Sequence, residues 1–119
     1  MRYFVSLLVW VALSIAGSAM ASEMPKIDED ALREAMDDVL KDSESARFRR
    51  LEIFKDKDAD TLYVICGEVN AKNSYGAYSG YTPFMGFRAT QTNGKVSYMI
   101  LGVSEASGMV CQQKKDGKL

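Results

Sequence analysis

The segment TLYVIC occupies positions 61–66, and it sets the architecture of the chain. In a strand, Leu62 and Val64 point to one face while Tyr63 and Ile65 point to the other. A strand with one wet face alternates apolar and polar residues, whereas this segment is apolar or aromatic at both sets of positions. The pattern is typical of a strand that is covered on both faces.

Three further segments have the period of two that indicates strands. Leu51 and Ile53 alternate with charged neighbours, and strand-like runs follow over 84–90 and 96–103. Asn93-Gly94 lies between the last two runs and favours a tight hairpin in which both central positions have positive φ. We therefore predict about four antiparallel strands.

The segment 27–40 has the spacing of an amphipathic helix instead. Asp28 is suited to the N-cap, and Ile27 and Leu32 would then pack across the first turn. Acidic residues occupy the other faces of this helix. Its apolar stripe consists of Ile27, Ala31, Leu32, Ala35, Met36, Val39 and Leu40. The predicted fold class is α+β, with one N-terminal amphipathic helix packed on an antiparallel sheet of about four strands.

Residues 1–21 have the features of an export signal. The start is short and basic, an apolar run of about thirteen residues follows, and Ala19-Met20-Ala21 has the small-x-small cleavage pattern. That run is short for a membrane span, so an uncleaved anchor is the weaker alternative. We expect cleavage after Ala21, no membrane insertion of the mature chain, and a periplasmic or secreted location.

Length and composition limit the possible classes of protein. About 98 of the 119 residues remain after position 21, which is enough for one modest core. We expect a single domain over 22–111 and a flexible tail over 112–119, because residues 112–118 have nothing to bury. A chain that is 47% hydrophobic is not intrinsically disordered. The absence of histidine removes the commonest general base and the commonest metal ligand.

Charge is distributed unevenly along the mature chain. Positions 22–46 carry nine acidic and three basic residues, whereas positions 47–119 carry eleven basic and seven acidic residues. No basic run has the density that nucleic-acid binding requires, so no nucleic-acid partner is expected. The first helix has an acidic polar face, which anionic lipid would repel.

Cys66 and Cys111 are the two cysteines of the chain. In an oxidising compartment, two cysteines in a small domain most simply form one disulfide. The loop of about 46 residues would give roughly 4 kcal/mol of stabilisation in the chain-entropy model. A reactive thiol is the alternative, but neither cysteine has a histidine partner or a Cys-x-x-Cys spacing.

The connection after Cys66 has an unusual composition. Tyr75, Tyr78 and Tyr81 recur at every third position and are interleaved with glycines. Tyr, Ser, Gly and Asn are the residues of adaptable binding loops, because tyrosine supplies a large contact area at low entropic cost. The alternative is that the rings only pack over the sheet edge and cap the core. We predict that at least one ring is exposed, with Tyr78 as the first choice, and that at least one is packed. The candidate binding residues of the loop are Asn70, Lys72, Asn73, Tyr75, Tyr78 and Tyr81.

Two segments carry a resemblance to a known group of proteins. They read DSESARF at positions 42–48 and CGEVNAKNSYGAYSGY at positions 66–81. The chain resembles a widespread family of small exported bacterial proteins that share approximately Asp-Pro-x-Ser-Ala-x-Phe, followed by Cys-Gly-x-Val-Asn-Ala-Lys-Asn-x-x-Gly-Gly-Tyr-x-Gly. Ser43 stands where that family has proline, and Ala77 stands where it has glycine. No activity is established for the family, so the resemblance implies export and fold, not a reaction.

Catalytic chemistry finds little support in the sequence. Glu68 and Arg88 lie in the two strands that flank the loop and are predicted to form a cross-strand ion pair. The alternative is a carboxylate positioned by an arginine at a cleft, but no second carboxylate lies nearby to complete an acid–base pair. Lys72 with nearby serines would suggest a Ser-Lys pair, although small polar loop residues more often form turns. We predict no catalytic residues, no metal site and no cofactor.

Three hypotheses about function follow. The first is a non-catalytic binding domain that presents the tyrosine loop to an envelope protein or a glycan. The second is an inhibitor or immunity-type protein that blocks a hydrolase of the cell envelope. The third is an enzyme whose site residues are not adjacent in the sequence.

Overall fold

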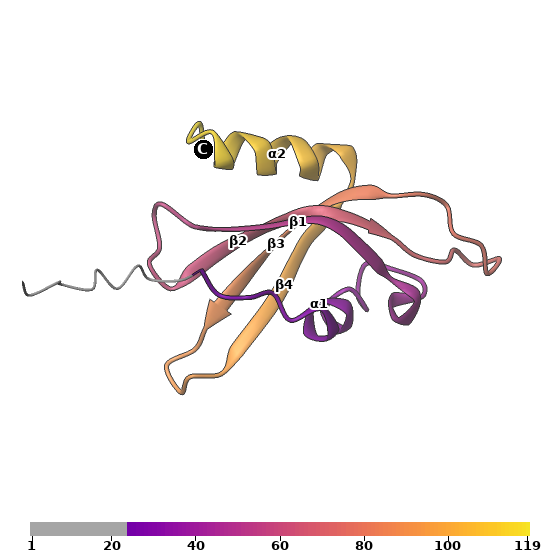
Figure 1. Ribbon diagram of the computed structural model, residues 1–119, viewed down its shortest axis with the longest axis horizontal. Helices are drawn as coiled ribbons and strands as arrows, with labels where there is room; N and C mark the ends of the chain where they lie inside the picture. The colour runs from indigo at the N-terminus through magenta and orange to yellow at the C-terminus, as the bar shows by residue number, and fades with distance from the viewer. Residues whose placement is uncertain (1–23) are drawn as a thin grey trace, which may run out of the picture.

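The computed structural model describes residues 24–119 as two helices and one four-stranded antiparallel sheet in the order β1-β2-β3-β4 (Figure 1). The predicted α+β class is confirmed. The predicted signal peptide, residues 1–21, lies outside the described residues. Within residues 24–119, no helix is long and apolar enough to cross a membrane. The elements are α1 (Glu29–Ala35), η1 (Ser43–Ser45), β1 (Arg47–Lys55), β2 (Leu62–Asn70), β3 (Thr82–Thr90), β4 (Val96–Val103) and α2 (Glu105–Lys115).

The central strand β2 is covered on both faces, as its composition predicts. Ile65 and Val69 pack with Phe84 in the larger core cluster, on the face that α1 covers. Val64 belongs to a second cluster with Met85, on the face that α2 covers. The molecule therefore has three layers, with the sheet between two helices (Figure 1).

Helix α1 is shorter than the predicted segment 27–40. Asp28 caps it as predicted, because its carboxylate accepts hydrogen bonds from the backbone N–H groups of residues 30 and 31. Leu32 and Met36 of the predicted apolar stripe are fully buried, whereas Val39, another member of that stripe, is exposed. Regular helix ends at Ala35 with Met36 as the C-cap, and two aspartates follow, whose charges are unfavourable at a helix C-terminus.

Helix α2 is an element that the sequence interpretation missed, and the predicted flexible tail over 112–119 is wrong for its first part. The helix continues to Lys115, and its first turn is capped by Ser104, whose hydroxyl accepts from the backbone N–H of Ser107. Cys111 lies in the middle of α2 and is joined to Cys66 of β2, with 6.0 Å between the two Cα atoms. The predicted disulfide thus fastens the second helix to the sheet.

The hairpin between β3 and β4 has a different turn from the predicted one. Gly94 has a φ of 83°, but Asn93 does not have positive φ. The backbone N–H of Gly94 donates to the carbonyl of Gln91, and the N–H of Gln91 donates to the carbonyl of Lys95. This is a three-residue loop with a left-handed glycine at its end, and not a two-residue turn.

Gly108 allows α2 to lie close to the sheet, and we expect its substitution by alanine to destabilise the protein by about 1–2 kcal/mol. A Cβ atom at this position would lie 2.7 Å from Cβ of Pro83, which is part of a rigid ring. This overlap outweighs the gain in helix propensity, roughly 1 kcal/mol. Urea denaturation of Gly108→Ala measures the effect, and Gln113→Ala, on an exposed position of α2, is the control. Equal or higher stability of Gly108→Ala would contradict this packing.

Candidate functional site

A bulge in β1 places neighbouring arginines on one face of the sheet. The register with β2 shifts between Arg49 and Glu52, and Arg50 has a φ of 53°. This left-handed conformation costs on the order of 1 kcal/mol for a residue other than glycine. Consecutive residues of a regular strand point to opposite faces, but here Arg49 and Arg50 both reach Glu68. The bulge therefore redirects one arginine toward the other.

Glu68 holds this pair of arginines and does not pair with Arg88, so that predicted ion pair is wrong. Nε of Arg49 lies 2.6 Å from one carboxylate oxygen of Glu68, and Nη1 of Arg50 lies 3.0 Å from the other. In the register of β2 and β3, Glu68 lies opposite Pro83, whereas Arg88 lies opposite Tyr63. The odd separation from Glu68 to Tyr63 along β2 puts Glu68 and Arg88 on opposite faces of the sheet.

Two of the arginines stack on tyrosines of the β2–β3 loop. The guanidinium of Arg47 lies 4.2 Å from the ring centre of Tyr78, and that of Arg49 lies 3.8 Å from the ring centre of Tyr81. A stacked guanidinium keeps its N–H groups in the plane parallel to the ring, where they remain able to donate. The tyrosines thus fix the direction of the arginine side chains.

The loop itself is anchored by its polar residues. The side-chain carbonyl of Asn73 accepts from the backbone N–H groups of Tyr75 and Ala77, and that of Asn70 accepts from the N–H of Gly80. The N–H of Lys72 donates to the hydroxyl of Ser45 in η1. Both asparagines therefore use an acceptor to shape the loop, while the ammonium group of exposed Lys72 lies 5.8 Å from the ring centre of Tyr78.

The exposed ring of the loop is Tyr75, and the first choice of Tyr78 is wrong. Tyr75 is 96% exposed. Tyr78 is half-buried because its ring lies against Arg47 and its hydroxyl donates to the carbonyl of Ser45 at 2.9 Å. Tyr81 is also half-buried. The predicted division into exposed and packed rings is present, but the exposed ring is Tyr75 and not Tyr78.

We name this surface the arginine–tyrosine face, and it consists of Arg47, Arg49, Arg50, Lys72, Tyr75, Tyr78 and Tyr81, with Glu68 at its base. It carries four basic groups and one acidic group, so it is suited to an acidic ligand. The carboxylate of Glu68 neutralises part of the positive charge of Arg49 and Arg50. Among the described residues, no carboxylate pairs with Arg47.

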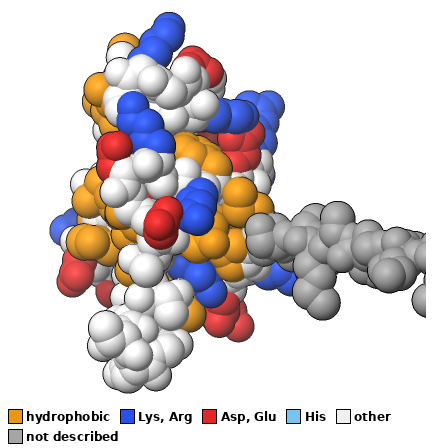
Figure 2. All heavy atoms as spheres, turned by 90° about the vertical axis from the view of Figure 1, so that its left-hand side faces the viewer, with side chains coloured by type: hydrophobic (Ala, Val, Ile, Leu, Met, Phe, Trp, Pro, Cys, Tyr) orange, Lys and Arg blue, Asp and Glu red, His pale blue; other side chains and the backbone are white. Residues whose placement is uncertain are grey.

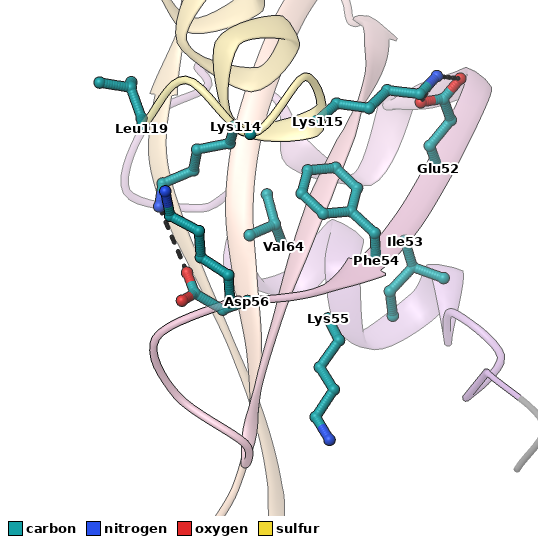
Figure 3. A pocket seen from close by; sticks show the side chains of 11 residues that line it. Glu52, Ile53, Phe54, Lys55, Asp56, Val64, Lys114, Lys115 and Leu119 are labelled. Carbon is teal, nitrogen blue, oxygen red and sulfur yellow. Dashed lines mark hydrogen bonds and ion pairs between the residues drawn. The ribbon is translucent and has the colours of Figure 1, made fainter.

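A separate cavity of about 620 Å³ lies between β1 and the C-terminal half of α2 (Figure 3). Phe54 and Val64 form its apolar part, and Figure 2 shows apolar and charged side chains together at this end of the molecule. Two ion pairs lie along its rim. Lys114 pairs with Asp56 at 3.3 Å, and Lys115 pairs with Glu52 at 2.8 Å. Since these lysines already have partners, the cavity offers less unused charge than the arginine–tyrosine face.

Metal and nucleophile chemistry gains no support from the site. Within residues 24–119, no group of three or more potential ligands among His, Cys, Asp and Glu is placed to hold a metal ion. Both cysteines are in the disulfide. The site instead presents guanidinium groups stacked on tyrosine rings, which can bind and orient an anionic group.

Two carboxylates make the stability of the fold dependent on pH. Hydrogen bonding from Arg49 lowers the pKa of Glu68 below its ordinary value, and the backbone N–H of Asp58, with Lys114, lowers the pKa of Asp56. A carboxyl group whose pKa is depressed in the folded state stabilises the fold above its unfolded-state pKa. This contribution is lost as the pH falls through the folded-state value.

We therefore expect the free energy of unfolding to decrease as the pH is lowered from about 5 to about 3, and to decrease less steeply in Glu68→Gln. Urea denaturation at several pH values measures both slopes. Asp60→Asn is the control, since it removes an equal charge from a side chain that is 96% exposed. Identical slopes for wild type and Glu68→Gln would show that the Arg49–Glu68–Arg50 cluster does not contribute.

The arginines of this face are the site residues that sequence interpretation missed. The run RFRR at 47–50 is visible in the sequence, but a strand of regular pleat would divide its arginines between two faces. Comparison of the chain with protein-family models, curated proteins and solved structures finds no match.

Proposed function

We propose that the protein is a small exported, non-catalytic binding domain of the bacterial cell envelope, and that its arginine–tyrosine face recognises an acidic surface of a protein partner. The leader-like residues 1–21 and the disulfide support export. The resemblance to small exported bacterial proteins supports the same location. The charge and geometry of the face support the choice of partner.

The observation that carries the proposal is the stacking of Arg47 on Tyr78. The ring fixes one flat side of the guanidinium, so binding an acceptor requires little further ordering of that side chain. Its planar N–H groups match the two oxygens of a carboxylate. Lys72, near the same ring, adds a second cation. A carboxylate of the partner would therefore meet two positive groups at this point.

The exposed ring of Tyr75, in the same β2–β3 loop as Tyr78, adds apolar contact area. A ring that is 96% exposed gives little to the stability of the monomer, but tyrosine and arginine are the residues most enriched at the energetic centres of interfaces. The β2–β3 loop extends beyond the end of the sheet (Figure 1). Tyr75 would thus reach a partner before the rest of the face.

The same projecting loop favours a second candidate, an inhibitor or immunity-type protein that inserts this loop into an envelope hydrolase. Loop anchoring through Asn73, Ser45 and Tyr78 would keep the loop rigid on insertion. The two candidates differ in the effect on the partner. An inhibitor abolishes the activity of the captured hydrolase, whereas a binding domain leaves the activity of its partner intact.

Capture from a periplasmic extract tests the proposal. Immobilised wild type should retain a protein that is released by about 0.5 M salt, because salt screens exposed charges. Arg47→Ala and Tyr75→Ala should each fail to retain it while keeping near-wild-type melting temperatures. Lys118→Ala, which removes a distant exposed charge, should retain it normally. Retention by all variants alike, or retention of an acidic polysaccharide in place of a protein, would overturn the proposal.

A further inference from the structure

The edge strand β4 differs in character from the other edge of the sheet. Both edge strands contain a bulge, at Arg49–Glu52 in β1 and at Leu101 in β4, but β1 also contains five charged residues, which keep a strand edge from pairing with another chain. β4 reads VSYMILGV and contains no charged residue. In the part of the chain that the structure describes, no strand pairs with the outer side of β4. Its outward backbone groups are therefore available to another strand.

Exposed apolar side chains lie beside this open edge. Met99 is 56% exposed and Leu101 is 55% exposed. Leu101 lines an apolar cavity of about 270 Å³ with Met85 of β3 and with Ala106 and Val110 of α2. Met99 lies opposite Phe87, and Phe87 points to the same face of the sheet as Met85. Met99 is therefore on the face that carries this cavity. The exposed apolar surface thus continues from the strand to the side of α2.

We propose that the protein forms a two-fold symmetric dimer in which β4 pairs antiparallel with β4 of a second copy. An antiparallel pair of identical strands is self-complementary, as a closed two-fold interface requires. The result would be one continuous sheet of eight strands. This inference does not depend on the proposed function, because the arginine–tyrosine face includes the opposite edge strand.

Side-chain and charge complementarity select the register. With the two-fold axis at Ile100, Met99 lies opposite Leu101 of the second copy, and each pair is apolar. Lys95 precedes β4 and Glu105 is the first residue of α2, after the extended Ser104; in the same register these two residues of opposite charge would face each other just beyond both ends of the paired strands. A Met99 side chain of the second copy would also lie at the mouth of the cavity lined by Leu101 and Val110.

Pairing through β4 would leave both arginine–tyrosine faces free. Each copy would carry its face at the far side of the joined sheet, because β1 and β4 are opposite edges. Two faces in one particle would bind a partner with repeated acidic sites more tightly than one face does.

Sedimentation velocity of the purified exported protein tests the dimer. We expect a monomer–dimer equilibrium between about 1 and 200 μM, and at least a tenfold weaker association in Met99→Lys/Leu101→Lys. Met109→Lys is the matched control, since Met109 is 66% exposed on α2 and does not line the cavity beside β4. A wild type that stays monomeric at 200 μM, or equal weakening by the control, would overturn the dimer.

Charge reversal tests the register independently of the apolar contacts. Lys95→Glu and Glu105→Lys should each weaken association by roughly fivefold, because each creates two like-charge contacts in the dimer. The double variant restores opposite charges and should return the association constant to within about twofold of wild type. Circular dichroism melts confirm that each variant is folded. Additive weakening in the double variant would contradict the proposed register.

Discussion

Reduction of the Cys66–Cys111 disulfide should lower the melting temperature by roughly ten degrees or more, because a link across this separation contributes about 4 kcal/mol in the chain-entropy model. The separation is 45 residues. Cys111 lies in the middle of α2 and is buried against the sheet, so the bond also holds the helix in place. Calorimetry with and without a reductant measures the shift.

A variant without the bond provides the control for this experiment. Cys66→Ala/Cys111→Ala should melt near the temperature of the reduced wild type, and reductant should not lower it further. Thiol titration of unfolded, unreduced wild type should find no free sulfhydryl. Two free sulfhydryls in that titration would contradict the disulfide, and an unchanged melting temperature after complete reduction would contradict its structural role.

The second large effect is expected for Phe84→Ala, which should lower the free energy of unfolding by about 3–5 kcal/mol. Phe84 is fully buried in the larger core cluster, and its ring meets that of Phe48 edge-to-face at a centroid distance of 5.8 Å. It also lies against Gly67 at the level of the β1 bulge. Urea denaturation measures the loss.

Tyr75→Ala is the matched control for the removal of an aromatic ring. Since Tyr75 is 96% exposed, its truncation should change the free energy of unfolding by less than about 0.5 kcal/mol. A cost below 1 kcal/mol for Phe84→Ala, or a cost above 2 kcal/mol for Tyr75→Ala, would contradict the packing described here.

The sheet could be predicted from the sequence because its strands have clear periodicity. Residues 62–66 are apolar or aromatic at both sets of alternating positions, and the structure places them within β2, between two helices. Asp28 indicated the start of α1, because aspartate is a common N-cap residue. These features depend on local spacing, which a single sequence displays directly.

Helix α2 could not be predicted in the same way. It contains Gly108 near its centre, and its polar C-terminal residues include no apolar stripe. Its position depends on tertiary contacts, namely the bond from Cys111 and the ion pair from Lys114 to Asp56. Ser104 as an N-cap with two lysines in the last turn was the available signal.

The arginine–tyrosine face depends on a backbone irregularity that no local pattern shows. Arg50 adopts its left-handed conformation at a bulge, where strand propensity predicts a regular pleat. The composition of the loop indicated recognition, but it could not show which ring is exposed. Tyr78 lies between two glycines and packs all the same, because Arg47 and Ser45, far away in the sequence, contact it.

The most direct test of the recognition proposal is the dissociation constant of the captured partner, measured by isothermal titration calorimetry with wild type and with Arg47→Ala. We predict at least a tenfold increase in the dissociation constant for Arg47→Ala, an increase that diminishes at high salt as screening weakens the charge contact. Lys118→Ala should bind as wild type does. Equal dissociation constants for wild type and Arg47→Ala would contradict recognition through the arginine–tyrosine face.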